Sequence, residues 1–207
     1  MVYANLEGNI YPEIFNEQAS RILDWIRENS NTDPNAYEMT NLFLLGAKYV
    51  HEGFDINVDT LTQMWDIRAG DFEQVGISKD NFVYRICEDS YKSVVENKPL
   101  VNDEASHHAL RKMAAIGLWL KQQQRDGETL HYDNSQELLQ LVEASRTLKG
   151  VHPELFDKYK FMDNLNVLSR LQPENVLSGR VSDTMQQLNN EKTANIEGKA
   201  SKEETTR

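Results

Sequence analysis

The five histidines are the first residues to test for chemistry, because imidazole binds metals and transfers protons near neutral pH. They are His51, His107, His108, His131 and His152. No two of them are spaced to present a pair of ligands on one helix face, and no His-Glu-x-x-His motif occurs. His107 and His108 are adjacent, and adjacent helical side chains point about 100° apart. We therefore expect no metal site and interpret these two histidines as a surface pair.

The only cysteine, Cys87, is the one candidate for a thiol nucleophile. A reactive thiolate needs a nearby histidine or a helix N-terminus to lower its pKa, and the neighbouring sequence offers neither. Cys87 follows Ile86 on an apolar helix face, where a cysteine behaves as a small hydrophobic side chain. We expect a buried structural residue. A single cysteine forms no internal disulfide, which suits the reducing cytoplasm.

Motifs for phosphate, nucleotide or acyl chemistry are missing from the sequence. There is no Gly-rich phosphate loop, no dinucleotide fingerprint and no Gly-x-Ser-x-Gly. Acidic pairs such as Glu88-Asp89 and Asp103-Glu104 are neighbours in sequence, so a helix does not place them side by side. The residues thus predict no catalytic site, no cofactor and no enzyme activity.

Acidic residues outnumber basic ones by 33 to 22, which gives a net charge of −11. Residues 1–60 carry ten acidic and three basic side chains, a net of −7. Binding to a phosphate backbone needs clustered lysine and arginine, so direct contact with nucleic acid is not expected. We interpret the acidic surface as mainly solvated. A sharper interpretation is an acidic N-terminal face that docks a basic partner.

The longest apolar stretch, from Ala114 to Leu120, is too short to cross a bilayer. The first residues lack the basic start and apolar run of a signal peptide. We expect a soluble, cytoplasmic protein without a membrane span, and association with a membrane through a partner stays open.

Helices are the elements that must position these residues, because apolar side chains recur at helical spacing along most of the sequence. One helix begins at Pro12, and Phe15, Ala19, Ile22 and Ile26 mark its apolar face. Further helices are expected over about 36–52, 58–69, 79–97, 103–125 and 135–149, and from Pro153 to just before Pro173.

The expected helix ends follow from capping residues. Asp33 before Pro34 is predicted to cap the second helix and Ser78 the fourth, while Gly53, Gly70 and Gly150 are predicted to end helices. The fourth helix is expected to bury Val83, Ile86, Cys87, Val94 and Val95. Gly46 and Gly117 stand inside apolar helices, which indicates close helix crossing rather than space for a ligand.

Strand patterns are almost absent, so the predicted fold class is all-α, a compact bundle of about seven helices. The helices near 36–52 and 103–125 are expected at its centre. Residues 1–172 should form the helical domain and 173–190 a linker with a short amphipathic helix. Residues 191–207 are polar and are predicted to be a disordered tail.

The short amphipathic helix is the one candidate binding element outside the domain. Val181, Met185 and Leu188 follow helical spacing, and an isolated helix of this length is marginal in water. It must therefore dock on its own domain or in a groove of a partner, and we expect the first. Val181, Met185 and Leu188 are therefore our candidate partner-binding residues.

The length, the acidic and Asn/Gln-rich composition, the predicted helices and the polar tail together resemble adaptor subunits of the coupling complex of bacterial type IVB secretion systems. The resemblance implies a non-enzymatic adaptor or chaperone subunit that binds other proteins in a hetero-complex and helps to recruit effector proteins. It lies in general character and carries no functional residues across.

Two alternatives stay open. The protein could be a phage- or plasmid-encoded acidic inhibitor of a nucleic-acid-binding protein, which a dense acidic stripe would favour. It could also be an all-α enzyme, which a pocket holding several His, Asp and Glu side chains would favour. An exposed apolar groove would favour the adaptor.

Overall fold

A computed structural model describes residues 10–29, 34–125 and 134–161, together with the single residues 186 and 190. This part of the protein is all-α, as predicted, and contains no strand. Its seven helices are α1 (Pro12–Glu28), α2 (Ala36–His51), α3 (Val58–Gln74), α4 (Phe82–Val95), α5 (Glu104–Arg125), α6 (Asn134–Val151) and α7 (Pro153–Lys158).

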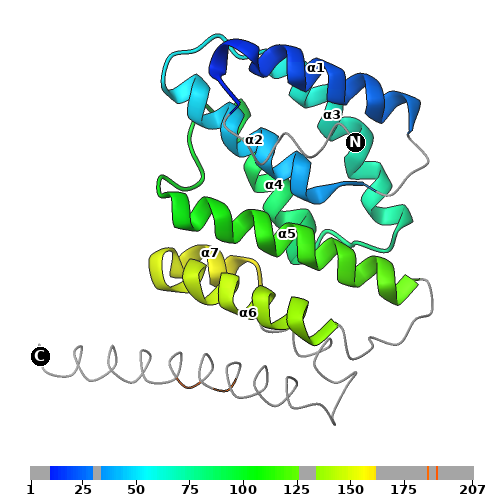
Figure 1. The fold of residues 1–207 in the computed structure, drawn as a ribbon, viewed down its shortest axis with the longest axis vertical. Coiled ribbons are helices and arrows are strands. Elements are labelled where there is room, and N and C mark those ends of the chain that lie inside the picture. The colour runs from blue at the N-terminus through cyan, green and yellow to red at the C-terminus, as the bar shows by residue number, and fades with distance from the viewer. Residues whose placement is uncertain (1–9, 30–33, 126–133, 162–185, 187–189, 191–207) are drawn as a thin grey trace, which may run out of the picture.

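The helices form a layered bundle with α5 across its middle (Figure 1). On one side α5 contacts α2 and α4, and on the other it contacts α6. α1 and α3 pack together at the end of the bundle beyond α2, and α7 packs on α6 at the opposite end. The predicted central position of α2 and α5 is confirmed.

α2 is largely buried, because 11 of its 16 residues are buried. Its N-cap is Asn35, whose side-chain oxygen accepts a hydrogen bond from the Glu38 amide at 3.2 Å. The prediction of Asp33 as the cap was wrong, because the helix begins two residues later than Pro34. At the other end Gly53 adopts a φ of +90°, as predicted for the residue that turns the backbone out of the helix.

α3 continues past Gly70 to Gln74, so the predicted helix end at Gly70 was wrong. The next turn is stabilised by Phe72, which is fully buried. The backbone leaves the helix at Gly76, with a φ of +77°, and the Ile77 amide donates a hydrogen bond to the Phe72 carbonyl at 2.8 Å. The burial of Phe72 thus explains why the helix continues for another turn after Gly70.

α4 differs from its prediction at both ends. Its N-cap is Asn81 rather than Ser78, and the oxygen of the Asn81 side chain accepts a hydrogen bond from the Val83 amide at 2.8 Å. At the C-terminal end Val95 is 52% exposed, not buried, because it is the last helical residue and lies off the apolar face. Val83, Ile86, Cys87 and Val94 are buried as predicted.

Two of the helical glycines, Gly46 and Gly117, lie where helices approach each other closely. A Cβ added at Gly117 would lie 2.5 Å from Phe82 Cζ and 2.6 Å from Val83 Cγ2. A Cβ added at Gly46 would lie 3.0 Å from Leu61 Cδ1. The interpretation of both glycines as crossing points is confirmed.

The last helices also end differently from the prediction. α6 runs through Gly150 to Val151, and α7 stops at Lys158, where Lys160 turns the backbone with a φ of +46°. The helix begins at Pro153 as predicted, but the expected unbroken continuation to just before Pro173 was wrong, because the helix is interrupted after Lys158. Val181, Met185 and Leu188, the domain end at 172 and the predicted tail over 191–207 lie outside the described residues. None of the helices that can be described is both long enough and apolar enough to cross a membrane.

Candidate functional site

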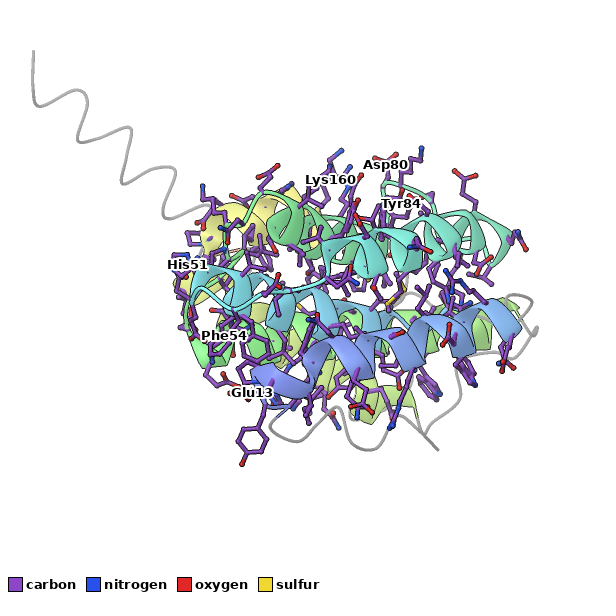
Figure 2. All side chains as sticks on the ribbon, turned by 90° about the horizontal axis from the view of Figure 1, so that it is seen from above. Glu13, His51, Phe54, Asp80, Tyr84 and Lys160 are labelled. Carbon is purple, nitrogen blue, oxygen red and sulfur yellow. The ribbon has the colours of Figure 1, made fainter. Side chains whose placement is uncertain are left out.

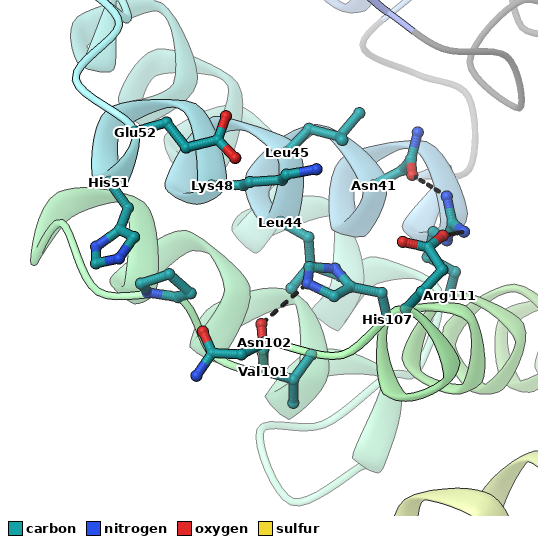
Figure 3. A pocket seen from close by; sticks show the side chains of 12 residues that line it. Asn41, Leu44, Leu45, Lys48, His51, Glu52, Val101, Asn102, His107 and Arg111 are labelled. Carbon is teal, nitrogen blue, oxygen red and sulfur yellow. Dashed lines mark hydrogen bonds and ion pairs between the residues drawn. The ribbon is translucent and has the colours of Figure 1, made fainter.

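A pocket of about 200 Å³ lies between the C-terminal half of α2 and the start of α5 (Figure 3). The loop between α4 and α5 closes it on a third side. It is lined by Asn41, Leu44, Leu45, Lys48, His51, Glu52, Pro99, Val101, Asn102, Glu104, His107 and Arg111.

Helical spacing explains why these side chains meet. On α2 the lining residues recur every three or four positions from Asn41 to Glu52, which places them along one face. On α5 the same spacing joins Glu104, His107 and Arg111. Beneath these polar side chains the pocket is apolar, where Leu44 on α2 and Val101 in the loop before α5 are buried.

Asp103 fixes the start of α5 and with it one wall of the pocket. Its carboxylate accepts a hydrogen bond from the Ser106 amide at 2.7 Å and lies 3.1 Å from His152 Nε2. Burial raises the pKa of Asp103, but the bonds from Ser106 and His152 outweigh it and lower the pKa below its usual value. An ionised carboxylate at this position also suits the positive end of the helix dipole.

Arg111 is the one charged residue in the pocket wall whose side chain is mostly buried, at 17% exposed. Its Nη1 donates a hydrogen bond of 2.7 Å to Asn41 Oδ1 on α2. Its Nη2 lies 3.5 Å from the carboxylate of Glu104, a side chain that is 87% exposed. Its Nε is buried and has no hydrogen-bond partner among the described residues.

His107 is half-buried beside Arg111, and its Nε2 lies 2.9 Å from the carbonyl oxygen of Val101. A carbonyl oxygen only accepts, so Nε2 carries the proton of this bond. Burial lowers the pKa of His107, and the positive charges of Arg111 and Lys48 lower it further. The ring is therefore neutral at pH 7, with Nδ1 as an acceptor.

The remaining charged groups of the pocket are Lys48 on α2 and Glu52, the C-cap of that helix, and both are exposed. Lys48 forms no ion pair within the described part of the protein, whereas Arg21 and Arg27 pair with Glu17 and Asp24 on α1. These three are the basic residues of the acidic segment 1–60. The one without a carboxylate partner among the described residues is the one that lines the pocket.

The described lining of the pocket lacks a hydroxyl or thiol nucleophile. Its lining contains no Ser, Thr, Cys or Tyr residue, and no recorded hydrogen bond joins His51 or His107 to Glu52 or Glu104. Within the described ranges, no three His, Cys, Asp or Glu side chains are grouped to hold a metal ion. What the pocket offers is donors and acceptors for a bound polar group.

Cys87 lies away from this pocket and is fully buried, as predicted. Its sulfur is 3.1 Å from the Thr40 hydroxyl. Burial raises the pKa of the Cys87 thiol to about 12, so the reactive thiolate is not formed at neutral pH.

A second polar group is enclosed where α1, α2 and α3 meet. Glu38 and Arg68 are both buried, and Arg68 Nη1 lies 2.9 Å from Asp71 Oδ2. Trp25 covers the guanidinium, with its ring centre 5.9 Å from Arg68 Cζ. Burial raises the pKa of Glu38 to about 8, although the charge of Arg68 acts to lower it. The space between them is only about 10 Å³, which is room for a single water.

The sequence prediction of a surface histidine pair is half right. His108 is exposed, but His107 faces the pocket and bonds the loop before α5. Lys48 and Arg111 were not predicted as site residues. The sequence offers a signal only for Lys48, which is an isolated lysine in an acidic segment. The predicted site residues Val181, Met185 and Leu188 are not among those that can be placed.

Comparison with protein-family models, curated proteins and solved structures found no match to this protein.

Proposed function

We propose that this protein is a non-enzymatic protein-binding adaptor and that the pocket between α2 and α5 receives a side chain of its partner. The observation that carries the proposal is the combination of size and lining. Ligand and cofactor sites usually enclose about 300–1,000 Å³. This pocket, at about 200 Å³, matches a single amino-acid side chain better than a cofactor.

The lining supports the same proposal. Leu44, Leu45 and Val101 form an apolar wall, and Arg111 and His107 present polar groups beside it. Interfaces between proteins commonly place one anchoring side chain in such a pocket, with a polar rim around it. Here Glu52 and Glu104 belong to the exposed rim.

The expected setting comes from the sequence. A single cysteine suits the cytoplasm, and the resemblance to adaptor subunits of type IVB coupling complexes points to a hetero-complex that recruits effector proteins. We include both in the proposal as the place and the class of assembly in which a partner should be sought.

An enzyme is the second candidate, because two histidines and two glutamates surround the pocket. His107, neutral at pH 7, would be the base. We prefer the adaptor because no hydrogen bond among the described residues joins either histidine to a carboxylate of the pocket, and no hydroxyl or thiol side chain is among the residues that line it.

Site-specific photo-crosslinking in the native host tests the proposal. A photoreactive residue at Asn102, exposed at the edge of the pocket, should crosslink one defined protein. The same residue at Glu73, exposed on the last turn of α3, is the matched control and should not. Filling the pocket by Leu45→Arg should abolish the Asn102 product while the helical circular-dichroism signal is retained.

Two results would overturn the adaptor. One is an equal crosslinking pattern from Asn102 and Glu73. The other is consumption of a small molecule from a host metabolite extract by the purified protein, lost in His107→Gln, which would establish the enzyme instead.

A further inference from the structure

The Arg111 guanidinium is held in place but has hydrogen-bonding capacity to spare. An arginine has several N–H donors arranged as a planar fork. The structure records one hydrogen bond from Arg111, to Asn41, and a longer ion pair of 3.5 Å to Glu104. Asn41 is buried, so the position of the guanidinium is set from within the bundle. Such a group can accept an anion once its long contact with Glu104 is released.

The burial of each charged side chain determines whether the interior of the pocket favours an anionic or a cationic ligand. Arg111 is the inner charge, whereas Glu104 and Glu52 are exposed and solvated. An ion pair with a solvated carboxylate contributes little, so an incoming anion can displace Glu104 at small cost. Lys48 adds a second positive charge without a carboxylate partner among the described residues.

We propose that this pocket binds a carboxylate carried on a short aliphatic stem, supplied by a partner protein. The carboxylate lies against Arg111 and Lys48, and the stem lies against Leu44, Leu45 and Val101. This inference rests on the proposed function and names the chemistry of the group that the pocket receives. A glutamate side chain presents this group, and a C-terminal residue with an aliphatic side chain presents a carboxylate beside an apolar group.

The charges around the pocket favour a monovalent anion. Arg111 and Lys48 are balanced by Glu52 and Glu104, so the lining has no net positive charge when the histidines are neutral. A phosphate group carries about −1.5 to −2 charges and meets more repulsion from the two rim carboxylates. The net charge of −11 opposes polyanions further. A carboxylate needs one positive charge, which Arg111 supplies.

His107 provides an internal reporter for this site. The positive charges that lower its pKa are Arg111 and Lys48, while Glu104 raises it. His51 and Glu52 are the other ionisable groups in the pocket wall. A bound carboxylate offsets the two cations and therefore raises the pKa of His107. By linkage, protonation of His107 strengthens carboxylate binding by the same factor.

The test is a titration of the full-length protein with small probes, followed by NMR of the Arg111 Nε–H group and the His107 ring. N-acetyl-glutamate α-amide presents the carboxylate of a glutamate residue, and N-acetyl-leucine presents a C-terminal one. N-acetyl-glutamine amide and N-acetyl-leucinamide are their neutral controls. A single anchoring group should bind with a Kd on the order of millimolar. The carboxylate probes should shift both signals, raise the pKa of His107 and bind more weakly at high salt.

Variants assign the effect to the pocket. Arg111→Met should weaken probe binding by about tenfold or more, because it removes the inner positive charge and its N–H donors. Lys48→Met should weaken it by about two- to fivefold, because the lysine is exposed. Arg146→Met on α6 and Lys79→Met before α4 remove exposed cations elsewhere and should leave the Kd unchanged. Because Lys48 is exposed, Lys48→Met should stay folded, so it still tests the pocket if Arg111→Met unfolds.

Three outcomes would overturn the inference: equal shifts from the neutral amides, tighter binding of inorganic phosphate than of either carboxylate, or no shift at about 50 mM probe, well above the expected Kd. The proposed function fails differently. If the probes bind but the Asn102 crosslink is absent, the anion site stands without a protein partner. If the crosslink forms but no probe binds, the adaptor stands and the carboxylate is wrong.

Discussion

The ammonium group of Lys158 lies 2.7 Å from both carboxylate oxygens of Asp89, which joins the last turn of α7 to the middle of α4. Arg85, one helical turn before Asp89, donates a hydrogen bond of 2.8 Å to the Lys158 carbonyl. Tyr159 and Phe161 are buried next to them, and the Phe161 ring contacts Phe82 with ring centres 5.4 Å apart. The end of α7 is thus attached to α4 by charge and by packing; Figure 2 shows Lys160 and Asp80 on the same side of the molecule.

The two partners of this ion pair should respond unequally to mutation. Asp89 is 7% exposed and Lys158 is 52% exposed. Lys158→Met leaves a buried carboxylate without its cation and should lower the free energy of unfolding by about 1–2 kcal/mol. Asp89→Asn leaves a lysine that water can solvate and should cost less, about 0.5–1 kcal/mol. Urea denaturation measures both, with the exposed Lys79→Met as control. Equal losses for Lys158→Met and Lys79→Met would contradict the role of the pair.

Glu38 should make stability fall as pH rises. Its pKa is about 8 in the folded protein against an ordinary value of 4.5, because burial disfavours the charged form. A group whose folded pKa is raised contributes stability below the unfolded pKa and loses that contribution as pH rises through the folded pKa. The contribution of Glu38 is therefore complete below about pH 4.5 and is lost by about pH 8.

Glu38→Gln isolates this effect. The amide cannot ionise, so relative to the wild type the variant should gain about 1–3 kcal/mol in unfolding free energy between pH 5 and pH 8.5. Urea denaturation at the two pH values gives the difference, and Glu28→Gln, an exposed glutamate at the end of α1, serves as control. Parallel pH profiles for wild type and Glu38→Gln would show that Glu38 titrates normally.

Two glycine-to-alanine exchanges should have opposite signs. At Gly117 the new methyl group would meet Phe82 at 2.5 Å, and relieving this contact should cost about 1–3 kcal/mol. At Gly70, within α3, nothing lies within 4 Å of the new methyl group. Gly70→Ala should therefore stabilise by about 0.5–1 kcal/mol through helix propensity. Guanidinium denaturation measures both, and a stable Gly117→Ala would refute the close crossing of α4 and α5.

Truncations test the C-terminal segment. Removing the residues after Asn189 should leave the melting temperature unchanged, because that segment has too few apolar residues to pack. Removing the residues after Leu171 also removes Val181, Met185 and Leu188 and should lower it by several degrees, about 1 kcal/mol. If the second truncation keeps its melting temperature but loses the Asn102 crosslink, these residues bind the partner instead of their own domain.

Helix positions could be predicted from the sequence, and helix ends only in part. The apolar period of α1 and the left-handed Gly53 are local properties, and both were predicted correctly. Gly70 was misread because a glycine inside a helix looks like a helix end until the burial of Phe72 in the next turn is known. Ser78 was predicted in place of Asn81 because serine and asparagine are both favoured N-caps, and the local sequence does not distinguish between them.

The pocket could not be predicted, because it depends on which helices pack together. Lys48 and Arg111 belong to α2 and α5, and no local pattern shows that the C-terminal half of one meets the start of the other. His107 was interpreted from its neighbour His108, whereas its environment is decided by Val101 and Arg111. The lining of the pocket, with Lys48 and Arg111 brought together from two helices, could be identified only from the fold.

The close crossing at Gly117 has a consequence for how this protein can diversify. Phe82 and Val83 occupy the space that any side chain at position 117 would need, so the three positions are not independent. A lineage that acquires alanine or serine at 117 must reduce the residue at 82 or 83, or move α4 away from α5. Among relatives that share this fold, we therefore expect position 117 to covary with 82 and 83, whereas position 70 should vary freely.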